Sequence, residues 1–214
     1  MSDKLSILSE KAAHSIELES FLLGATGPSA KKILITSCHS GEGKTTIACL
    51  MALNLALKAK ARVLLIDANY IHPELHSYFN VASKPGLWDG LESLDEKTLV
   101  KKTSYAMLNI LPCGSFSAAS VQWLRSGGLK QKLEQILSQY DYVIMDSSSV
   151  LESSESAFLF KLFDGVLFVL ECEKTRWEVL QAAQDKVVQV GGKVLGAVLN
   201  KRRYYIPEGV YAKI

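Results

Sequence analysis

The sequence has few of the features that mark membrane, secreted or metal-stapled proteins. Its four cysteines stand at positions 38, 49, 113 and 172, without the paired spacing of a zinc site or a disulfide framework. No apolar run reaches the ~18 residues that a membrane-spanning helix needs. The N-terminal residues lack the long apolar core and small-residue cleavage site of a signal peptide. These absences predict a cytoplasmic protein, recruited to the inner face of a membrane only through a partner.

An excess of one charge is also missing. The formal net charge is +2, which is too small to indicate a nucleic acid or an acidic surface as partner, so no nucleic acid is expected. Hydrophobic residues make up 48% of the chain and charged residues 21%, as in ordinary globular proteins. A chain of 214 residues is long enough to bury a sizeable core.

Short apolar runs alternate with amphipathic stretches along the chain. The runs predicted as strands lie at 32–37, 62–67, 108–112, 142–146, 165–171 and 193–200, and the stretches predicted as helices lie near 45–59, 120–139, 153–163 and 175–191. Several of the strand runs are continuously apolar, which is typical of parallel strands covered on both faces. The alternation predicts an α/β fold with a doubly wound, mainly parallel sheet and helices on both faces.

Three segments are predicted. Residues 1–30 are expected to form an amphipathic helix that ends near Gly24, followed by a linker through Gly27-Pro28-Ser29. Residues 31–203 are expected to form one nucleotide-binding domain. Residues 204–214 form a C-terminal tail that contains tyrosines.

One segment carries most of the functional information. Residues 37–46 are Ser-Cys-His-Ser-Gly-Glu-Gly-Lys-Thr-Thr, between a strand-like run and a helix-like run. A strand, a Gly-rich turn and a helix start point backbone N–H groups and a partial positive charge at phosphate oxygens. Gly41 and Gly43 allow close approach, Lys44 reaches the β/γ-phosphates, and Thr45 is placed to ligate Mg²⁺. The pattern predicts a nucleoside triphosphate site, although Cys38 stands where the usual spacing has glycine.

Polar residues follow three of the predicted strands. Asp67 ends the second strand, Asp146 the fourth and Asn200 the sixth. Because ligands of open α/β sheets bind beyond the carboxyl ends of the strands, all three are expected at the edge that holds the phosphate turn. A carboxylate after an apolar strand can hold Mg²⁺ opposite the threonine hydroxyl.

An ordered set of motifs resembles those of bacterial tyrosine kinases that govern capsule and exopolysaccharide synthesis. Residues 63–73 resemble the family's second nucleotide motif and residues 140–146 its Walker B segment; further matches lie at 85–87, 111–114, 164–166, 174–176 and 194–201. The resemblance covers roughly residues 31–205 and implies a P-loop NTPase-like fold. In the wider superfamily, plasmid-partition and septum-site ATPases carry a signature lysine where this chain has His39, which favours the kinase branch.

The resemblance implies a role for each matching residue. Lys44, Asp67 and Asp146 would be catalytic, and Thr45, Asp67 and Asp146 would hold Mg²⁺. Thr46 would lie on the α-phosphate side, and Asn200 would read the adenine. The implied nucleotide-binding set is Ser40, Gly41, Glu42, Gly43, Lys44, Thr45, Thr46 and Asn200, with ATP and Mg²⁺ as cofactors. The implied partner is a membrane polysaccharide co-polymerase whose cytoplasmic segment helps to complete the site.

The chain departs from the family pattern at several positions. Asn69 replaces an acidic residue, the run Ser147–Ser149 replaces Thr-Pro-Pro after the Walker B aspartate, and Ser40 stands where proline is frequent. The N-terminal helix has no arginine, whereas the family uses arginines there to join subunits into a ring, so homo-oligomer formation by that route is not expected. Loss of a carboxylate near the metal weakens the orientation of Mg²⁺ and of a hydroxyl nucleophile.

The tail and the departures leave alternatives open. Tyr204, Tyr205 and Tyr211 are candidate phosphoacceptors for a neighbouring subunit, or else Tyr204 and Tyr205 cover the sheet edge. The leading hypothesis is a tyrosine autokinase that transfers the ATP γ-phosphoryl group to tail tyrosines. The alternative is a degenerate nucleotide-binding regulatory module of the polysaccharide export machinery. A partition-type ATPase ranks third.

Overall fold

A seven-stranded sheet forms the centre of the protein. The structure, a computed structural model, describes residues 3–14, 30–89 and 96–202. The strands are β1 (Lys32–Ser37), β2 (Val63–Ala68), β3 (Lys101–Lys102), β4 (Leu108–Leu111), β5 (Tyr142–Ser147), β6 (Gly165–Glu171) and β7 (Val194–Asn200), in the spatial order β3-β4-β2-β5-β1-β6-β7. All neighbouring pairs are parallel except β3 and β4. The mainly parallel sheet was predicted.

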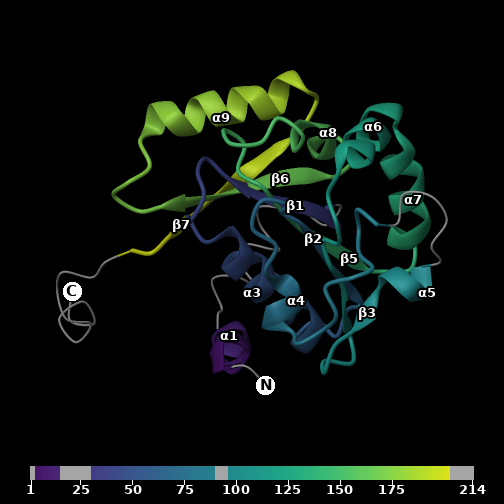
Figure 1. Cartoon of the computed structure of the whole chain (residues 1–214). Coiled ribbons are helices and arrows are strands. Elements are labelled where there is room, and N and C mark those ends of the chain that lie inside the picture. Colours follow the sequence, from purple (N-terminus) through teal and green to yellow (C-terminus); the bar gives the residue numbers. More distant parts are fainter. Residues whose placement is uncertain (1–2, 15–29, 90–95, 203–214) are drawn as a thin grey trace, which may run out of the picture.

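Helices cover both faces of this sheet (Figure 1). The helices are α1 (Asp3–His14), α3 (Lys44–Leu57), α4 (Leu75–Tyr78), α5 (Glu96–Leu99), α6 (Ala118–Ser126), α7 (Gly128–Leu137), α8 (Ala157–Phe160) and α9 (Trp177–Gln189). The helix α3 lies below the sheet in Figure 1 with α1 beside it, whereas α6, α8 and α9 lie above. This is the doubly wound α/β arrangement.

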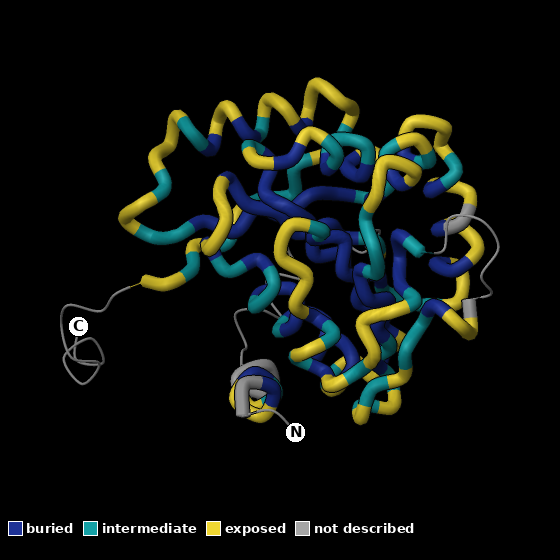
Figure 2. The backbone as a smooth tube through the Cα atoms, in the orientation of Figure 1, coloured by how far each residue is buried: buried dark blue, intermediate teal, exposed yellow. Residues whose placement is uncertain are grey.

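Each central strand supplies side chains to two cores. Ile33 and Ile35 of β1 belong to the cluster under α3, and Leu34 between them belongs to the cluster under α6–α9. All three are completely buried, because successive side chains of a strand point to opposite faces. Figure 2 shows the buried backbone concentrated in the sheet and on the inner sides of the helices. The strands are apolar throughout because both faces are covered.

The structure corrects several predicted elements. β3 was missed because Lys101–Lys102 has neither apolar residues nor alternation, and its pairing with β4 is antiparallel. The helix predicted over 120–139 is divided into α6 and α7 at Gly127, whose φ of 79° is left-handed. The helix predicted over 153–163 shortens to α8. The predicted N-terminal helix is observed to His14, and residues 15–29 lie outside the described part.

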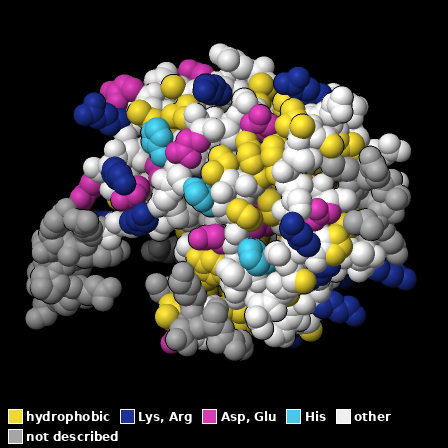
Figure 3. Space-filling model, in the orientation of Figure 1, with side chains coloured by type: hydrophobic (Ala, Val, Ile, Leu, Met, Phe, Trp, Pro, Cys, Tyr) yellow, Lys and Arg dark blue, Asp and Glu magenta, His cyan; other side chains and the backbone are white. Residues whose placement is uncertain are grey.

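The surface mixes charge and apolar groups. Figure 3 shows acidic, basic and histidine side chains interspersed with a band of hydrophobic ones on the face that it draws. Trp177 is 65% exposed and Leu199 69% exposed. Among the described helices, none combines the length and the apolar character that crossing a bilayer requires.

Candidate nucleotide site

The phosphate loop connects β1 to α3 in the middle of the sheet. β1 ends at Ser37 and α3 begins at Lys44, with Gly43 as its N-cap. Gly41 and Gly43 adopt left-handed φ values of 81° and 99°, which glycine reaches without steric cost. A Cβ atom on Gly43 would lie 2.1 Å from Nδ2 of Asn200. The loop therefore requires glycine at position 43 for both its backbone angle and its packing.

A pocket of about 300 Å³ opens at this loop. Six of the predicted nucleotide-binding residues line it, namely Ser40, Gly41, Gly43, Lys44, Thr45 and Thr46, together with Asn69, His72, Glu74, Tyr78 and Lys201. It lies beyond the carboxyl ends of the strands and at the N-terminus of α3, where backbone N–H groups and the helix dipole favour anions. The sequence prediction of this location agrees with the geometry.

Lys44 lies inside the protein and not in open solvent. Its side chain is buried, and Nζ donates a hydrogen bond to Oγ of Ser149 at 3.1 Å. Burial lowers the pKa of Lys44, while the negative charge of Asp146 opposes that effect. The ammonium group is thus held at the pocket wall by a neutral hydroxyl, which a phosphate oxygen can replace.

Thr45 and Asp146 meet at the predicted metal position. Thr45 Oγ1 donates to Asp146 Oδ2 at 2.7 Å, and Asp67 is the register partner of Asp146 across β2 and β5. Burial raises the pKa of Asp146 to about 6, and the Thr45 hydrogen bond and the Lys44 charge act against this rise. Burial, and next the charge of Asp146, raises the pKa of Asp67. The two carboxyl groups share a dry environment that disfavours their joint ionisation without a cation.

The donor set at this position fits Mg²⁺. Oδ1 of Asp146 is buried and has no hydrogen-bond partner in the part of the chain that the structure describes. Mg²⁺ prefers oxygen ligands and keeps several from water or phosphate, using one or two from the protein. Within residues 3–14, 30–89 and 96–202, no group of three or more His, Cys, Asp or Glu side chains could hold a metal by itself. Thr45 and Asp146 would therefore share the ion with nucleotide phosphates.

Asp67 lies behind the pocket and not at its surface. It is completely buried, and its oxygens accept the N–H groups of Asn69 and Leu75, each at 3.1 Å. The neighbouring side chain that lines the pocket is Asn69, not Asp67. Its catalytic role stays a prediction.

Asn200 fastens the phosphate loop in this structure. Its Nδ2 donates to the backbone oxygen of Glu42 at 2.9 Å, and it does not line the pocket. Glu42 is buried: its carboxylate accepts the N–H of His39 at 2.8 Å and the hydroxyl of Thr175. Both residues therefore support the loop from behind, and the predicted contact of Asn200 with adenine stays a prediction.

Matches to known proteins decide the family. The family described as AAA domain matches residues 30–193. The chain belongs to this family.

Curated relatives of this AAA domain protein include bacterial tyrosine-protein kinases and a succinoglycan biosynthesis transport protein. Tyrosine-protein kinase YwqD of Bacillus subtilis (strain 168) is 29% identical over 174 residues, which are 81% of this chain and 73% of YwqD. Tyrosine-protein kinase ptk of Acinetobacter johnsonii is 31% identical over 204 residues, 91% of this chain and 27% of ptk. Succinoglycan biosynthesis transport protein ExoP of Rhizobium meliloti (strain 1021) is 31% identical over 181 residues, 82% of this chain and 23% of ExoP. The chain thus spans about a quarter of the last two proteins.

Solved structures agree with this assignment. The kinase domain of VpsO is 27% identical with a TM-score of 0.79, over 95% of this chain and 100% of that chain. The chimerical protein CapA2B2 is 23% identical with a TM-score of 0.83, over 93% of this chain and 91% of that chain. The predicted P-loop NTPase-like fold and the predicted resemblance to bacterial tyrosine kinases are both confirmed.

Sequence reasoning did not predict the contacts that Lys201, Ser149 and Glu152 make around the phosphate loop of this AAA domain. Nζ of Lys201 donates to the backbone oxygen of Gly41 at 2.6 Å and to Glu171 Oε2 at 3.2 Å, so a second lysine lies at the pocket. Ser149 holds Lys44, and Glu152 accepts the N–H of Ser40 at 2.8 Å. The only sequence signal was position: each of these residues lies shortly after a strand whose carboxyl end faces the loop.

Three further side chains lie near the loop or along the turn after β5. His72 lines the pocket, and its backbone N–H donates to Asn69 Oδ1 at 3.3 Å. Glu155 accepts the hydroxyl of Tyr70 at 2.7 Å and does not line the pocket. The candidate phosphoacceptors Tyr204, Tyr205 and Tyr211 lie outside the described residues.

Proposed function

We propose that this AAA domain protein binds ATP with Mg²⁺ in the pocket at the phosphate loop and transfers the γ-phosphoryl group to tyrosine. The observation that carries the proposal is that Lys44 and Thr45 line one pocket at the start of α3, and that the buried Asp146 accepts the Thr45 hydroxyl directly behind it. A cationic amine, a metal-ligating hydroxyl and a Walker B-type carboxylate are the parts that phosphoryl transfer needs. The kinase relatives support tyrosine as the acceptor.

Each residue has a task in the proposed reaction. Loop N–H groups and the start of α3 would orient the phosphates, and Lys44 would exchange Ser149 for a phosphate oxygen and stabilise the developing charge. Thr45 and Asp146 would hold Mg²⁺, which supplies neutralising charge when bound. The bond from the γ-phosphorus to the β–γ bridging oxygen breaks, with ADP as the leaving group, as a bond to the tyrosine oxygen forms and the hydroxyl proton is released to water. Asp67 is the proposed group that orients the tyrosine hydroxyl, for which it would exchange a bond to the N–H of Asn69 or Leu75 for one to the tyrosine.

Tail tyrosines of a neighbouring copy are the proposed acceptors. The proposed tail at 204–214 follows the proposed nucleotide-binding domain at 31–203, and β7 ends at Asn200 beside the phosphate loop. The tail would therefore start close to an active site. Mass spectrometry after incubation with ATP·Mg²⁺ would identify phosphate on Tyr204, Tyr205 or Tyr211, and its absence from all three would overturn this acceptor assignment.

Phosphotyrosine formation tests the proposal directly. The purified protein is incubated with ATP·Mg²⁺, alone and with the cytoplasmic segment of the proposed membrane partner, and compared with Lys44→Ala. Lys130→Ala is a matched control, because this lysine is exposed on α7, forms an ion pair with Glu134 at 3.8 Å and does not line the pocket. We expect signal from the wild type and the control and none from Lys44→Ala. Equal nucleotide affinity of wild type and Lys44→Ala would contradict the assigned site.

A regulatory module without kinase activity is the second candidate. The observation that favours it is that a neutral residue, Asn69, lines the pocket where the kinases have an acidic one, and its Oδ1 accepts the Ser148 hydroxyl at 3.2 Å. An amide there supplies less negative charge for Mg²⁺ and the nucleophile than a carboxylate does. ATP binding without phosphotyrosine, even with the partner segment present, would support this module and exclude the kinase.

A polysaccharide co-polymerase in the membrane is the proposed partner. ExoP, whose name describes a succinoglycan biosynthesis transport protein, matches this chain over 23% of its own length. The chimerical CapA2B2 shares the fold. We propose that this protein works in the cytoplasm and is recruited to the membrane by such a partner. Co-purification from a cell extract with a membrane protein would test this, and recovery in the soluble fraction alone would contradict it.

A further inference from the structure

An acidic side chain is hydrogen-bonded to the phosphate loop from outside the pocket. Glu152 lies in the turn after β5 and accepts the N–H of Ser40 through Oε1 at 2.8 Å. Ser40 belongs to the loop and lines the 300 Å³ pocket together with Gly41, Gly43 and Lys44. The N–H groups of such a loop favour anions, so a carboxylate is a chemical competitor for the ligand that the loop is built to hold.

The charge of Glu152 also acts on the phosphate-binding lysine. Together with Asp146 and Glu42, it opposes the effect of burial on the pKa of Lys44. The acid is therefore close enough to interact electrostatically with the residue that would meet the terminal phosphates. A triphosphate that enters the pocket brings several negative charges toward the same group, and like charges repel.

Resting on the proposed function, we propose that Glu152 is a specificity-determining residue of the nucleotide site. Its carboxylate holds the Ser40 N–H and lowers the affinity for nucleotides whose terminal phosphate brings negative charge to the loop. The effect is larger for ATP than for ADP, because ATP carries the additional phosphate.

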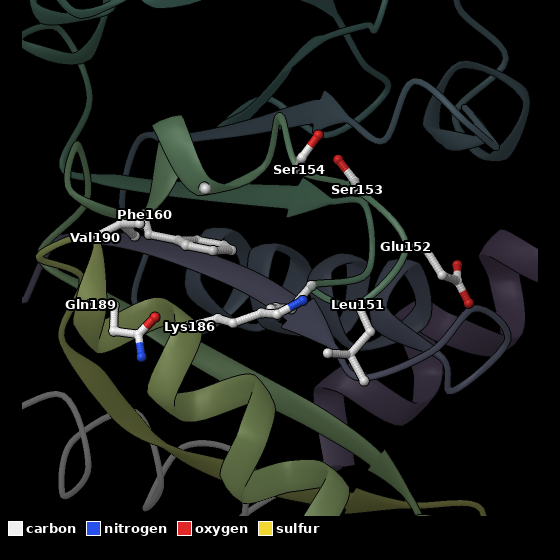
Figure 4. Close-up of a pocket in the computed structure, with 10 residues that line it drawn as sticks. Leu151, Glu152, Ser153, Ser154, Phe160, Lys186, Gln189 and Val190 are labelled. Atoms are coloured by element: carbon white, nitrogen blue, oxygen red, sulfur yellow. The ribbon is translucent and has the colours of Figure 1, made fainter.

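The surroundings of Glu152 leave it free to move when nucleotide binds. It is exposed and forms part of the wall of a second pocket, of about 490 Å³, which also includes Leu151, Phe160 and Lys186. Figure 4 shows Lys186 extending from α9 toward Leu151, while the Glu152 side chain points away from Phe160. No packed core has to open for Glu152 to leave the Ser40 N–H, so a bound nucleotide can displace it.

Glu155 provides a matched comparison on the same turn. It is an acid three positions later, but its carboxylate accepts the Tyr70 hydroxyl and not a loop N–H. The hydrogen bond from Tyr70 lowers its pKa, so it remains ionised and equally charged at neutral pH. Glu155→Gln therefore makes the same chemical change without touching the phosphate loop.

Calorimetric titration of the full chain tests the inference. A non-hydrolysable ATP analogue and ADP, each with Mg²⁺, are titrated into wild type, Glu152→Gln and Glu155→Gln, at about 50 mM and about 300 mM salt. Glutamine keeps an oxygen for the Ser40 N–H and removes only the charge. We expect Glu152→Gln to bind the ATP analogue roughly three- to fivefold more tightly at low salt, with a smaller gain for ADP and at high salt. Glu155→Gln should match the wild type.

The contrary outcomes are distinct. Unchanged or weaker binding by Glu152→Gln would show that Glu152 only braces the loop, and an equal gain in Glu155→Gln would show a general effect of net charge. Either result overturns the inference while leaving the proposed function intact. If neither wild type nor Glu152→Gln binds nucleotide, the proposed function fails and the inference fails with it.

Discussion

Because the carboxyl group of Asp146 is buried, we predict that replacing it by a neutral group stabilises the metal-free protein. Burial raises the pKa of Asp146 from 3.8 to about 6. Because the folded state then binds the proton more tightly than the unfolded state, stability is fully present below pH 4 and falls as the pH rises toward 6. This rise in the pKa corresponds to a loss of at most about 3 kcal/mol in the free energy of unfolding. Asp146→Asn should not lose stability in this way, because its side chain is neutral at every pH.

The magnitude is reduced by one opposing contact. Asp146 attracts the charge of Lys44, and the pKa of about 6 already includes this attraction. The hydrogen bond from Thr45 can be kept, because asparagine still offers an oxygen at that position. We therefore expect Asp146→Asn to be more stable than the wild type by about 1–3 kcal/mol near pH 8, which amounts to several degrees in Tm for a domain of this size. Near pH 4 the two proteins should be equally stable.

Denaturation curves in a metal chelator, near pH 4 and near pH 8, measure this difference. Addition of Mg²⁺ and ADP should then stabilise the wild type and have little effect on Asp146→Asn, because the variant loses the proposed metal ligand. Asp141→Asn is the control for removing an exposed acid: Arg62 holds the pKa of Asp141 low, at about 2. A variant that is less stable than the wild type near pH 8, or a difference independent of pH, would refute the electrostatic reasoning.

Two further variants test the loop. Gly43→Ala should lower nucleotide affinity at least about tenfold, because the new Cβ would lie 2.1 Å from Asn200 Nδ2 at a φ of 99°. Gly127→Ala is the control: its φ is also left-handed but the space around it is open, so it should lose stability and keep its nucleotide affinity. Equal losses of affinity in both variants, measured by calorimetry, would contradict this. Asn200→Ala should destabilise the nucleotide-free protein by about 1 kcal/mol through loss of the bond to Glu42. An unchanged free energy of unfolding would show that Asn200 does not stabilise the nucleotide-free protein.

The sequence was most informative where structure is local. The strand β1, the glycine turn and the helix α3 are consecutive, so their geometry follows from glycine conformation and the hydrophobic pattern alone. The carboxyl-end rule also placed Asp146 correctly beside Thr45, because β5 and β1 are neighbouring parallel strands. Both predictions needed only the order of elements along the chain.

Contacts set by the exact register were not predictable. Lys201 and Gly41 are 160 positions apart and meet only because β7 and β6 end at the level of the phosphate loop. Asp67 lies near the end of β2, as expected, but backbone N–H groups donate to both of its carboxylate oxygens. Asn69 lines the pocket in its place. Asn69 comes two positions after Asp67 and lies beyond the end of β2, so the path of the chain after the strand decides which side chain faces the pocket, and no composition signal carries that information.

The serines after Asp146 show how departures from the kinase pattern are accommodated in the packing behind the phosphate loop. A run of buried hydroxyls is costly unless each is hydrogen-bonded. Ser147 donates to the backbone oxygen of Ile35, Ser148 donates to Asn69, and Ser149 accepts from Lys44. The departures at Ser148 and Asn69 thus satisfy each other directly. Because the phosphate loop, Thr45 and Asp146 remain intact around them, these changes should alter the rate of phosphoryl transfer far more than the binding of nucleotide.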